Sequence, residues 1–302
     1  MDVLRSIGEF WLRRRADPSA TAMAAVEGLT PATVITGGSE GLGFELARCI
    51  AAESRVVVLV ARSQEVRDAA ASLQTAYPRS TAIGEVLDVA SPEAPAQLDA
   101  LLARHGLYLD VLVNNAAVGL GGEFSDLDPA ALDLLVATNV AALTRLTRHY
   151  LPAMRARCRG GILNLSSLAA FTPGPWQAPY FASKAYVLSL TAAIGAECAG
   201  EGVRVCAFAC GPIETAIHGK MRTESTIYRA VLPSTSPERM AKIAWRSYRL
   251  GRRIVVPGIV TGMLAALSRV VPHELLLPIV RALMRPRLLT RPTRSRSAPG
   301  HL

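Results

Sequence analysis

Hydrophobic and polar positions alternate in a regular way between Pro31 and about Pro257, where short apolar runs are separated by longer amphipathic stretches. Parallel strands buried on both faces are short and continuously apolar, and the helices that connect them are amphipathic. The pattern therefore predicts repeated βαβ units around a parallel sheet. The runs predicted as strands are residues 32–36, 55–60, 81–87, 109–113, 161–165, 203–209 and 253–256.

Six stretches between these strands have the length of helices, and start or stop signals such as Pro92, Pro129 and Gly200 mark their ends. Seven strands and six helices in this order fit an α/β fold with one doubly wound, seven-stranded parallel sheet, the Rossmann fold. The stretches predicted as helices are residues 42–53, 64–77, 92–104, 129–157, 178–200 and 237–250.

The alternating pattern predicts a single domain at residues 31–257, between an N-terminal extension, 1–30, and a C-terminal extension, 258–302. We expect short loops everywhere in the domain except at 213–236, a stretch without clear periodicity. Because a long irregular segment in a compact domain often covers a binding site, we interpret 213–236 as a lid.

Composition narrows the function classes. The net charge is +9, but the arginines that carry the excess gather at the ends of the chain without a recognisable nucleic-acid-binding module, so we expect no nucleic-acid partner. The five cysteines show no CxxC spacing, and we expect no metal site. No apolar run reaches the ~18 to 20 residues that cross a bilayer, and the N-terminus lacks a secretory signal pattern, so we expect a cytoplasmic protein.

A glycine-rich loop follows the first predicted strand and leads into a helix. Residues 36–43 read Thr-Gly-Gly-Ser-Glu-Gly-Leu-Gly. Glycines let the backbone approach a pyrophosphate, and the helix N-terminus offers unpaired N–H groups and a positive dipole end. A tight turn without a ligand is the alternative, but the strand before the loop and the helix after it favour a dinucleotide.

The end of the second predicted strand distinguishes the two nicotinamide cofactors. An acidic residue at this place binds the ribose hydroxyls of NAD, whereas an arginine pairs with the 2′-phosphate of NADP. The chain has no acid here and offers Arg62, which favours NADP(H), although Arg62 could also be an ordinary solvated residue. Glu40 in the glycine loop weighs mildly against NADP(H).

Four further residues suggest acid–base chemistry. Tyr180 and Lys184 lie four positions apart, which places both on one face of a helix, and a nearby cation favours the phenolate form of a group whose ordinary pKa is near ~10. Ser167 ends a strand at the edge of the sheet where ligands bind, and Asn139 lies in an otherwise apolar helix. Taken singly, Ser167 could be a hydrogen bonder at a strand end and Asn139 a satisfied packing residue.

Taken in order, the motifs TGGSEGLG, LDV, NNAA, TNV, LSS, YFASK and CGPIET resemble the short-chain dehydrogenase/reductase family over residues 31–257. The resemblance implies that Tyr180 is the general acid in reduction and the base in oxidation, and that Ser167 holds the substrate oxygen. It implies that Lys184 binds the nicotinamide ribose and depresses the phenol pKa, while Asn139 supports a water in a proton relay. The implied catalytic set is Asn139, Ser167, Tyr180 and Lys184.

The resemblance also implies which residues contact NADP(H), although Ala117 and Cys210 stand where the family usually has Gly and Pro. These departures touch the backbone shape near the cofactor and remove no catalytic group. The implied cofactor contacts are Thr36, Gly37, Ser39, Gly41, Leu42, Gly43, Arg62, Asp88, Val89, Asn114, Tyr180, Lys184, Pro212 and Thr215.

Three further motifs resemble bacterial reductases that act on lipid-like ketones. They are ARS after the second predicted strand, GPIET before the predicted lid, and VVPG at the start of the apolar, basic tail. We therefore expect an NADP(H)-dependent oxidoreductase for a small-molecule carbonyl or secondary alcohol, with a 3-ketoacyl or steroid-like ketone as substrate. Two alternatives are an enzyme of a soluble secondary metabolite and a non-catalytic NADP(H)-binding sensor. A sensor would have no chemical need for all four catalytic residues. Relatives pair through their long helices, so we expect a homodimer or homotetramer.

The C-terminal extension has apolar residues at recurring positions, followed by an arginine-rich end without acidic residues. If it forms helices, the apolar side could lie on a membrane surface with the arginines near anionic headgroups. Alternatively, the extension packs on the core or on a second subunit. A third hypothesis for the whole chain is a membrane-bound scaffold.

Overall fold

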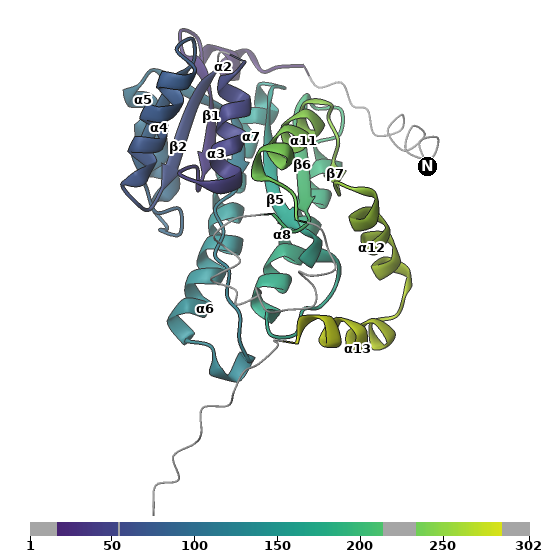
Figure 1. Ribbon diagram of the computed structural model, residues 1–302. Coiled ribbons are helices and arrows are strands. Elements are labelled where there is room, and N and C mark those ends of the chain that lie inside the picture. The colour runs from purple at the N-terminus through teal and green to yellow at the C-terminus, as the bar shows by residue number, and fades with distance from the viewer. Residues whose placement is uncertain (1–16, 54, 214–233, 286–302) are drawn as a thin grey trace, which may run out of the picture.

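The computed structural model describes residues 17–53, 55–213 and 234–285, which form a parallel sheet with helices on both faces (Figure 1). The strand order is β3-β2-β1-β4-β5-β6-β7, and every neighbouring pair is parallel. This confirms the predicted doubly wound, seven-stranded sheet. The strands are β1 (Thr30–Thr36), β2 (Val56–Ala61), β3 (Thr81–Val86), β4 (Leu107–Asn114), β5 (Gly160–Ser167), β6 (Val203–Cys210) and β7 (Ile254–Val255).

Helices α3, α4 and α11 cover one face of the sheet, and α5, α7 and α8 cover the other. In β2, Val57 and Leu59 face the first layer while Val58 and Val60 face the second, because successive side chains of a strand point to opposite faces. Both faces are buried, which explains the continuous apolar runs in the sequence. The helices of the two layers are α3 (Gly41–Ala51), α4 (Glu65–Ala76), α5 (Ala94–Arg104), α7 (Leu143–Ala156), α8 (Ala178–Glu197) and α11 (Pro237–Arg249).

The single helix predicted at 129–157 has an irregular middle. Helix α6 (Pro129–Val136) continues into one π-helical segment, η2 (Ala137–Ala142), before α7 begins. The side chain of Asp128 caps the start of α6 by accepting hydrogen bonds from the backbone amides of Ala130 and Ala131. Single π-helical turns often occur at functional sites, and this one contains Asn139.

The expectation of short loops outside 213–236 is wrong for the connection between β4 and α6. This connection runs over residues 115–128 and contains one short 3-10 turn, η1 (Phe124–Asp126). A second 3-10 turn, η3 (Leu168–Phe171), follows β5. The sequence does not show these turns because their apolar residues have no helical or strand period of their own.

The continuous helical stretch Pro129–Ala156 is long and apolar enough to cross a membrane by length and composition. Its second half, however, packs on the sheet, since Leu146, Tyr150 and Met154 of α7 belong to the hydrophobic cluster on that face. Burial against the sheet therefore explains the apolar positions of α7.

The chain on either side of 31–257 contacts the sheet domain. Before it, α2 (Ala20–Ala24) is held by a hydrogen bond from the amide of Ser19 to the carbonyl of Ala156. After it, α12 (Ile259–Val270) runs along the side of the sheet, and α13 (His273–Met284) turns back below it (Figure 1). Ala265 of α12 packs in a cluster with η3 and α8, and the guanidinium of Arg269 lies 5.2 Å from the Phe171 ring centroid.

Candidate active site

The glycine-rich loop turns sharply and packs directly on the chain after β4. Gly37 and Gly41 have φ values of 63° and 57°, in the left-handed region that favours glycine. A Cβ atom on Gly43 would lie 2.3 Å from the carbonyl oxygen of Gly37, and one on Gly37 would lie 2.9 Å from Cα of Ala116. No larger residue fits at Gly43 without moving the backbone.

Thr36 and Asn115 fasten this loop. The hydroxyl of Thr36 accepts hydrogen bonds from the amides of Asn115 and Ala116, both at 3.0 Å. The Asn115 side-chain amide donates to the carbonyls of Thr36 and Gly37, at 3.0 and 2.9 Å. Sequence reasoning missed Asn115, although a second amide directly after a strand end was a usable signal.

Helix α3 begins in this loop with a start suited to an anion. Its N-cap residue Glu40 is exposed and makes no side-chain cap, and the first turn contains no acidic residue. The amides of the first turn are thus not capped by a side chain, although the Glu40 carboxylate stands at the positive dipole end of the helix. Ser39 is half-buried and Leu42 is buried beside it. These residues fit the diphosphate of a dinucleotide.

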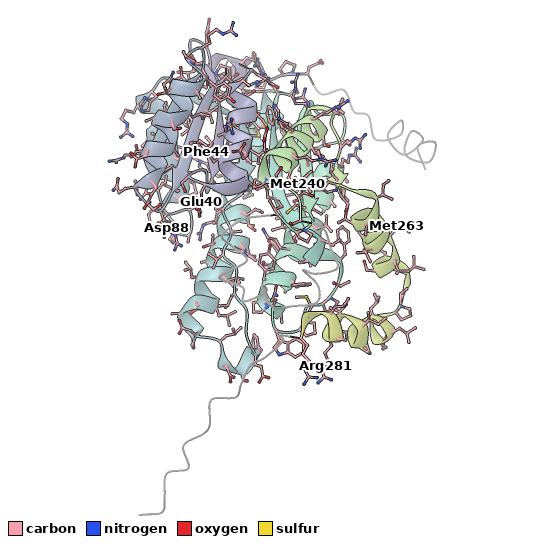
Figure 2. The ribbon with its side chains drawn as sticks, in the orientation of Figure 1. Glu40, Phe44, Asp88, Met240, Met263 and Arg281 are labelled. Carbon is pink, nitrogen blue, oxygen red and sulfur yellow. The ribbon has the colours of Figure 1, made fainter. Side chains whose placement is uncertain are left out.

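The residues predicted to border the adenosine follow the carboxyl ends of parallel strands and so lie at the same edge of the sheet, and Asp88 is labelled in Figure 2. Arg62 is exposed directly after β2, and Val89 is buried. The Asp88 side chain accepts a hydrogen bond from the amide of Ala90 at 2.9 Å. Arg62 is therefore accessible to a ligand phosphate.

Asn114 is buried at the end of β4 and takes part in a series of hydrogen bonds between the central strands and the helices that pack on them. Its amide donates to Asn164 Oδ1 of β5 at 2.8 Å and to Thr147 Oγ1 of α7 at 3.3 Å. The Asn164 amide donates in turn to Thr191 Oγ1 of α8 at 2.9 Å. This chain joins the two central strands to α7 and α8.

Tyr180 and Lys184 lie side by side in the first turns of α8, with 8 % and 5 % of their surfaces exposed. Lys184 Nζ is 5.7 Å from the centroid of the Tyr180 ring and donates a hydrogen bond of 2.9 Å to the carbonyl of Leu165. Burial lowers the pKa of Lys184 from its ordinary 10.5 to about 8, because the interior disfavours the charged form. The structure thus places an ammonium group beside a phenol.

Three side chains hold the start of α8 in place. The hydroxyl of Ser166 donates to the carbonyl of Lys184 at 2.9 Å, and that of Ser183 donates to the carbonyl of Tyr180 at 2.7 Å. Asn139 donates from its amide to Ser183 Oγ at 3.1 Å. Ser183 was missed from the sequence because a serine inside a helix has no distinctive signal.

Asn139 also binds the chain after β4. Its Oδ1 accepts from the amide of Val118 at 2.7 Å, and its Nδ2 donates to the carbonyl of the same residue at 2.9 Å. A single buried amide therefore connects η2, the segment after β4 and α8. The water predicted from the family resemblance remains a prediction.

Ser167 lies half-buried at the end of β5, where its Oγ accepts a hydrogen bond of 3.2 Å from the amide of Ala169. Since Ser167 is the acceptor in this bond, its O–H group can donate to another oxygen. Its register partner on the neighbouring strand β6 is Cys210, whose thiol donates a hydrogen bond of 3.2 Å to the carbonyl of Ser166. Burial raises the pKa of that thiol, so Cys210 is a packing residue here.

The segment after β6 begins next to this site. Pro212 is buried and accepts a hydrogen bond at its carbonyl from the amide of Thr235, and Ile213 forms a bridge with Thr235. The two ends of the predicted lid thus lie together. Thr215 and most of the lid lie outside the described residues.

Comparison with known proteins gives one family. A family model for short chain dehydrogenases matches residues 31–226. A protein assigned as the ketoacyl reductase of the monensin polyketide synthase from Streptomyces virginiae is 36% identical over 193 residues, which are 63% of this chain and 73% of that protein. Galactitol 2-dehydrogenase (L-tagatose-forming) from Cereibacter sphaeroides is 32% identical over 204 residues, 67% of this chain and 78% of that protein.

Among solved structures, one of 7β-hydroxysteroid dehydrogenase superposes with a TM-score of 0.73 over 84% of this chain and 98% of that one, at 24% identity. At this identity the likeness extends to the fold alone. It agrees with the sheet order described above.

Proposed function

This chain belongs to the short-chain dehydrogenase family, and from that premise we propose that it reduces a lipid-like ketone with NADPH. Oxidation of alcohols and reduction of ketones is the reaction class of the family; the cofactor, the substrate and the roles of single residues are our proposal. The observation that carries it is the buried Lys184 beside Tyr180, at the end of the sheet where the glycine-rich loop also lies.

In this proposal Tyr180 donates its phenolic proton to the carbonyl oxygen of the substrate. The Lys184 ammonium stabilises the phenolate that remains, because an opposite charge within a few ångströms favours the ionised form. Ser167 donates a hydrogen bond to the same oxygen through its O–H group, because its Oγ is the acceptor in the bond with Ala169. Asn139 holds the start of α8 next to the segment after β4, because its side chain bonds both Ser183 and Val118. The nicotinamide, when bound, supplies the hydride.

The glycine-rich loop and the start of α3 would hold the diphosphate of the cofactor, since the loop backbone has room for close approach and α3 has no acid in its first turn. Arg62 would pair with the 2′-phosphate of NADP, because it is exposed after β2 where NAD enzymes have an acid. Asp88, Val89 and Asn114 would border the adenosine, and Pro212 would border the nicotinamide.

A lipid-like substrate is supported by the likeness to a ketoacyl reductase and by apolar side chains around Tyr180. The likeness to galactitol 2-dehydrogenase favours the second candidate, a soluble polar alcohol or ketone. A sensor without turnover is the third candidate, and the presence of Tyr180, Lys184, Ser167 and Asn139 argues against it.

The test follows oxidation of NADPH and of NADH with 3-ketoacyl thioesters, steroid-like ketones and sugar-derived ketones. We expect turnover of an apolar ketone with NADPH, and a loss of roughly a hundred- to ten-thousandfold in Tyr180→Phe. Tyr186→Phe is the matched control, because Tyr186 lies on the same helix, exposed, with its hydroxyl next to Thr144. Turnover of polar ketones alone would refute the substrate, and equal rates of wild type and Tyr180→Phe would favour the sensor.

The cofactor has a separate test. Arg62→Asp should raise KM for NADPH at least tenfold and leave KM for NADH little changed, because the substitution replaces a phosphate partner with a repelling charge. Arg79→Asp, another exposed arginine of the same half of the sheet, is the control. No difference between the two variants would show that Arg62 does not bind the 2′-phosphate.

We also propose that this is a cytoplasmic enzyme that touches anionic membranes through its C-terminal extension. Met263, Leu267 and Val270 of α12 are exposed, and Arg281 of α13 lies on the outer surface of the molecule (Figure 2). Sedimentation with vesicles should show binding to anionic but not neutral lipid, weakened by Met263→Asp. Equal binding by both vesicle types would contradict the proposal. An assembly of two or four copies stays a prediction.

A further inference from the structure

Helix α13 reaches the neighbourhood of Tyr180 from the far end of the chain. Met284, its last residue, is 2 % exposed and belongs to the same hydrophobic cluster as Tyr180, and Val280 packs against that cluster one turn earlier. Positions four apart share one face of a helix, so Val280 and Met284 form its inner side. The outer side is solvent-exposed, with Leu275 64 % and Ile279 58 % exposed.

The rest of the cluster comes from segments that follow the carboxyl ends of β4 and β5. Ligands of open α/β sheets bind at that edge. In Figure 1 the end of α13 lies below the start of α8, on the side of the molecule that this edge faces. The other members are Leu135, Ala169 and Phe181, with Val118, Leu120 and Trp176 packed against them.

The loop before α8, which contributes Trp176 to the cluster, is held firmly. Trp176 has a φ of 63°, which costs a bulky residue free energy and persists only where the surroundings enforce it. Its carbonyl accepts a hydrogen bond of 2.8 Å from the amide of Gly122. A Cβ on Gly174 would lie 2.3 Å from Cγ of Phe181, so the loop before α8 is pressed against that ring.

From these contacts we infer that α13 is a specificity element of the substrate site, in which Val280 and Met284 contact an apolar substituent of the ketone. The inference rests on the proposed function, because it takes Tyr180 as the proton donor. Where α13 packs toward Tyr180 the neighbouring side chains are hydrocarbon or thioether apart from the phenol and the indole of Trp176, while the charged Lys184 lies 5.7 Å from the Tyr180 ring centroid. A polyol or charged substituent would lose its hydration here without a partner, whereas an apolar one is stabilised.

The experiment compares Met284→Ala and Val280→Phe with Ile279→Ala, an exposed position on the same helix. Met284→Ala should raise KM for a bulky steroid-like ketone roughly tenfold or more, with kcat and the kinetics of a short 2-alkanone little changed. Val280→Phe narrows the site without removing packing, and it should likewise raise KM for the bulky ketone more than KM for the short one. Ile279→Ala should behave as wild type on both substrates.

Two outcomes would overturn the inference. One is an equal effect of Met284→Ala and Val280→Phe on bulky and short ketones, together with lower thermal stability, because this would show a structural role only. The other is no effect beyond that of Ile279→Ala. Calorimetric titration of the bulky ketone into Tyr180→Phe, alone and combined with Met284→Ala, separates this question from catalysis. If the wild type reduced no ketone but Met284→Ala still weakened binding, the proposed function would fail and the specificity role of α13 would stand.

Discussion

Replacing Lys184 by Met should stabilise the cofactor-free protein near neutral pH while removing its activity. Lys184 is a buried ammonium with one hydrogen bond, from Nζ to the carbonyl of Leu165 at 2.9 Å. Methionine has nearly the same length and shape, carries no charge and packs well in apolar surroundings. The substitution therefore removes a buried charge and leaves the volume filled.

The magnitude follows from the pKa of Lys184, which burial lowers from 10.5 to about 8. Each pKa unit corresponds to about 1.4 kcal/mol, so the charged form costs the folded protein about 3 kcal/mol at pH 7. Leaving the Leu165 carbonyl without its donor offsets about 1 to 2 kcal/mol of the gain. We expect Lys184→Met to raise the free energy of unfolding by about 1 to 2 kcal/mol at pH 7.

The pH dependence has a definite sign. Between pH 8 and pH 10.5 the unfolded wild type binds more protons at Lys184 than the folded one, so wild-type stability rises with pH in this window. The variant has no such contribution. Its advantage should therefore shrink by about 2.5 kcal/mol between pH 7 and pH 10 and reverse in sign.

Urea unfolding of both proteins without cofactor, at pH 7, 8, 9 and 10 and constant ionic strength, measures this difference. Lys242→Met is the control, because Lys242 is exposed and its pKa is raised by its hydrogen bond to Glu238, at 2.6 Å. The difference between this control and the wild type should stay nearly constant from pH 7 to pH 10. A pH-independent difference for Lys184→Met would refute the argument that burial lowers the pKa of Lys184.

Three further predictions concern stability and cofactor binding. Gly43→Ala should weaken NADPH binding at least tenfold by titration calorimetry, because its Cβ would lie 2.3 Å from the carbonyl oxygen of Gly37, and unchanged affinity would contradict this. Gly262→Ala should raise the free energy of unfolding by about 0.5 to 1 kcal/mol, because alanine favours a helix and nothing lies within 4 Å of the new Cβ in α12. A loss of stability would count against the packing of α12. Asn164→Ala should cost about 3 kcal/mol in urea unfolding, because it removes two buried hydrogen bonds, one from Asn114 and one to Thr191, and a cost below about 1 kcal/mol would mean that water replaces the amide.

Local pattern was enough to predict the sheet and its helices. Each strand is a continuous apolar run because both faces of the sheet are covered, and helices such as α3, α4, α7 and α11 are amphipathic because only one side of each is covered. The glycine loop and the four-residue spacing of Tyr180 and Lys184 were likewise visible, since turn geometry and helix periodicity act between near neighbours along the chain.

The tertiary structure alone decided which distant residues meet. Nothing near Asn139 in the sequence indicates that its amide binds Val118 and Ser183, because those contacts depend on how the π-helical turn and α8 pack. In the same way, an apolar residue such as Met284 can be buried against any apolar surface, and only the course of α12 and α13 brings it to the cluster of Tyr180. Hydrophobic burial is strong but non-directional, so composition predicts that such a residue is covered, while chain topology determines what covers it.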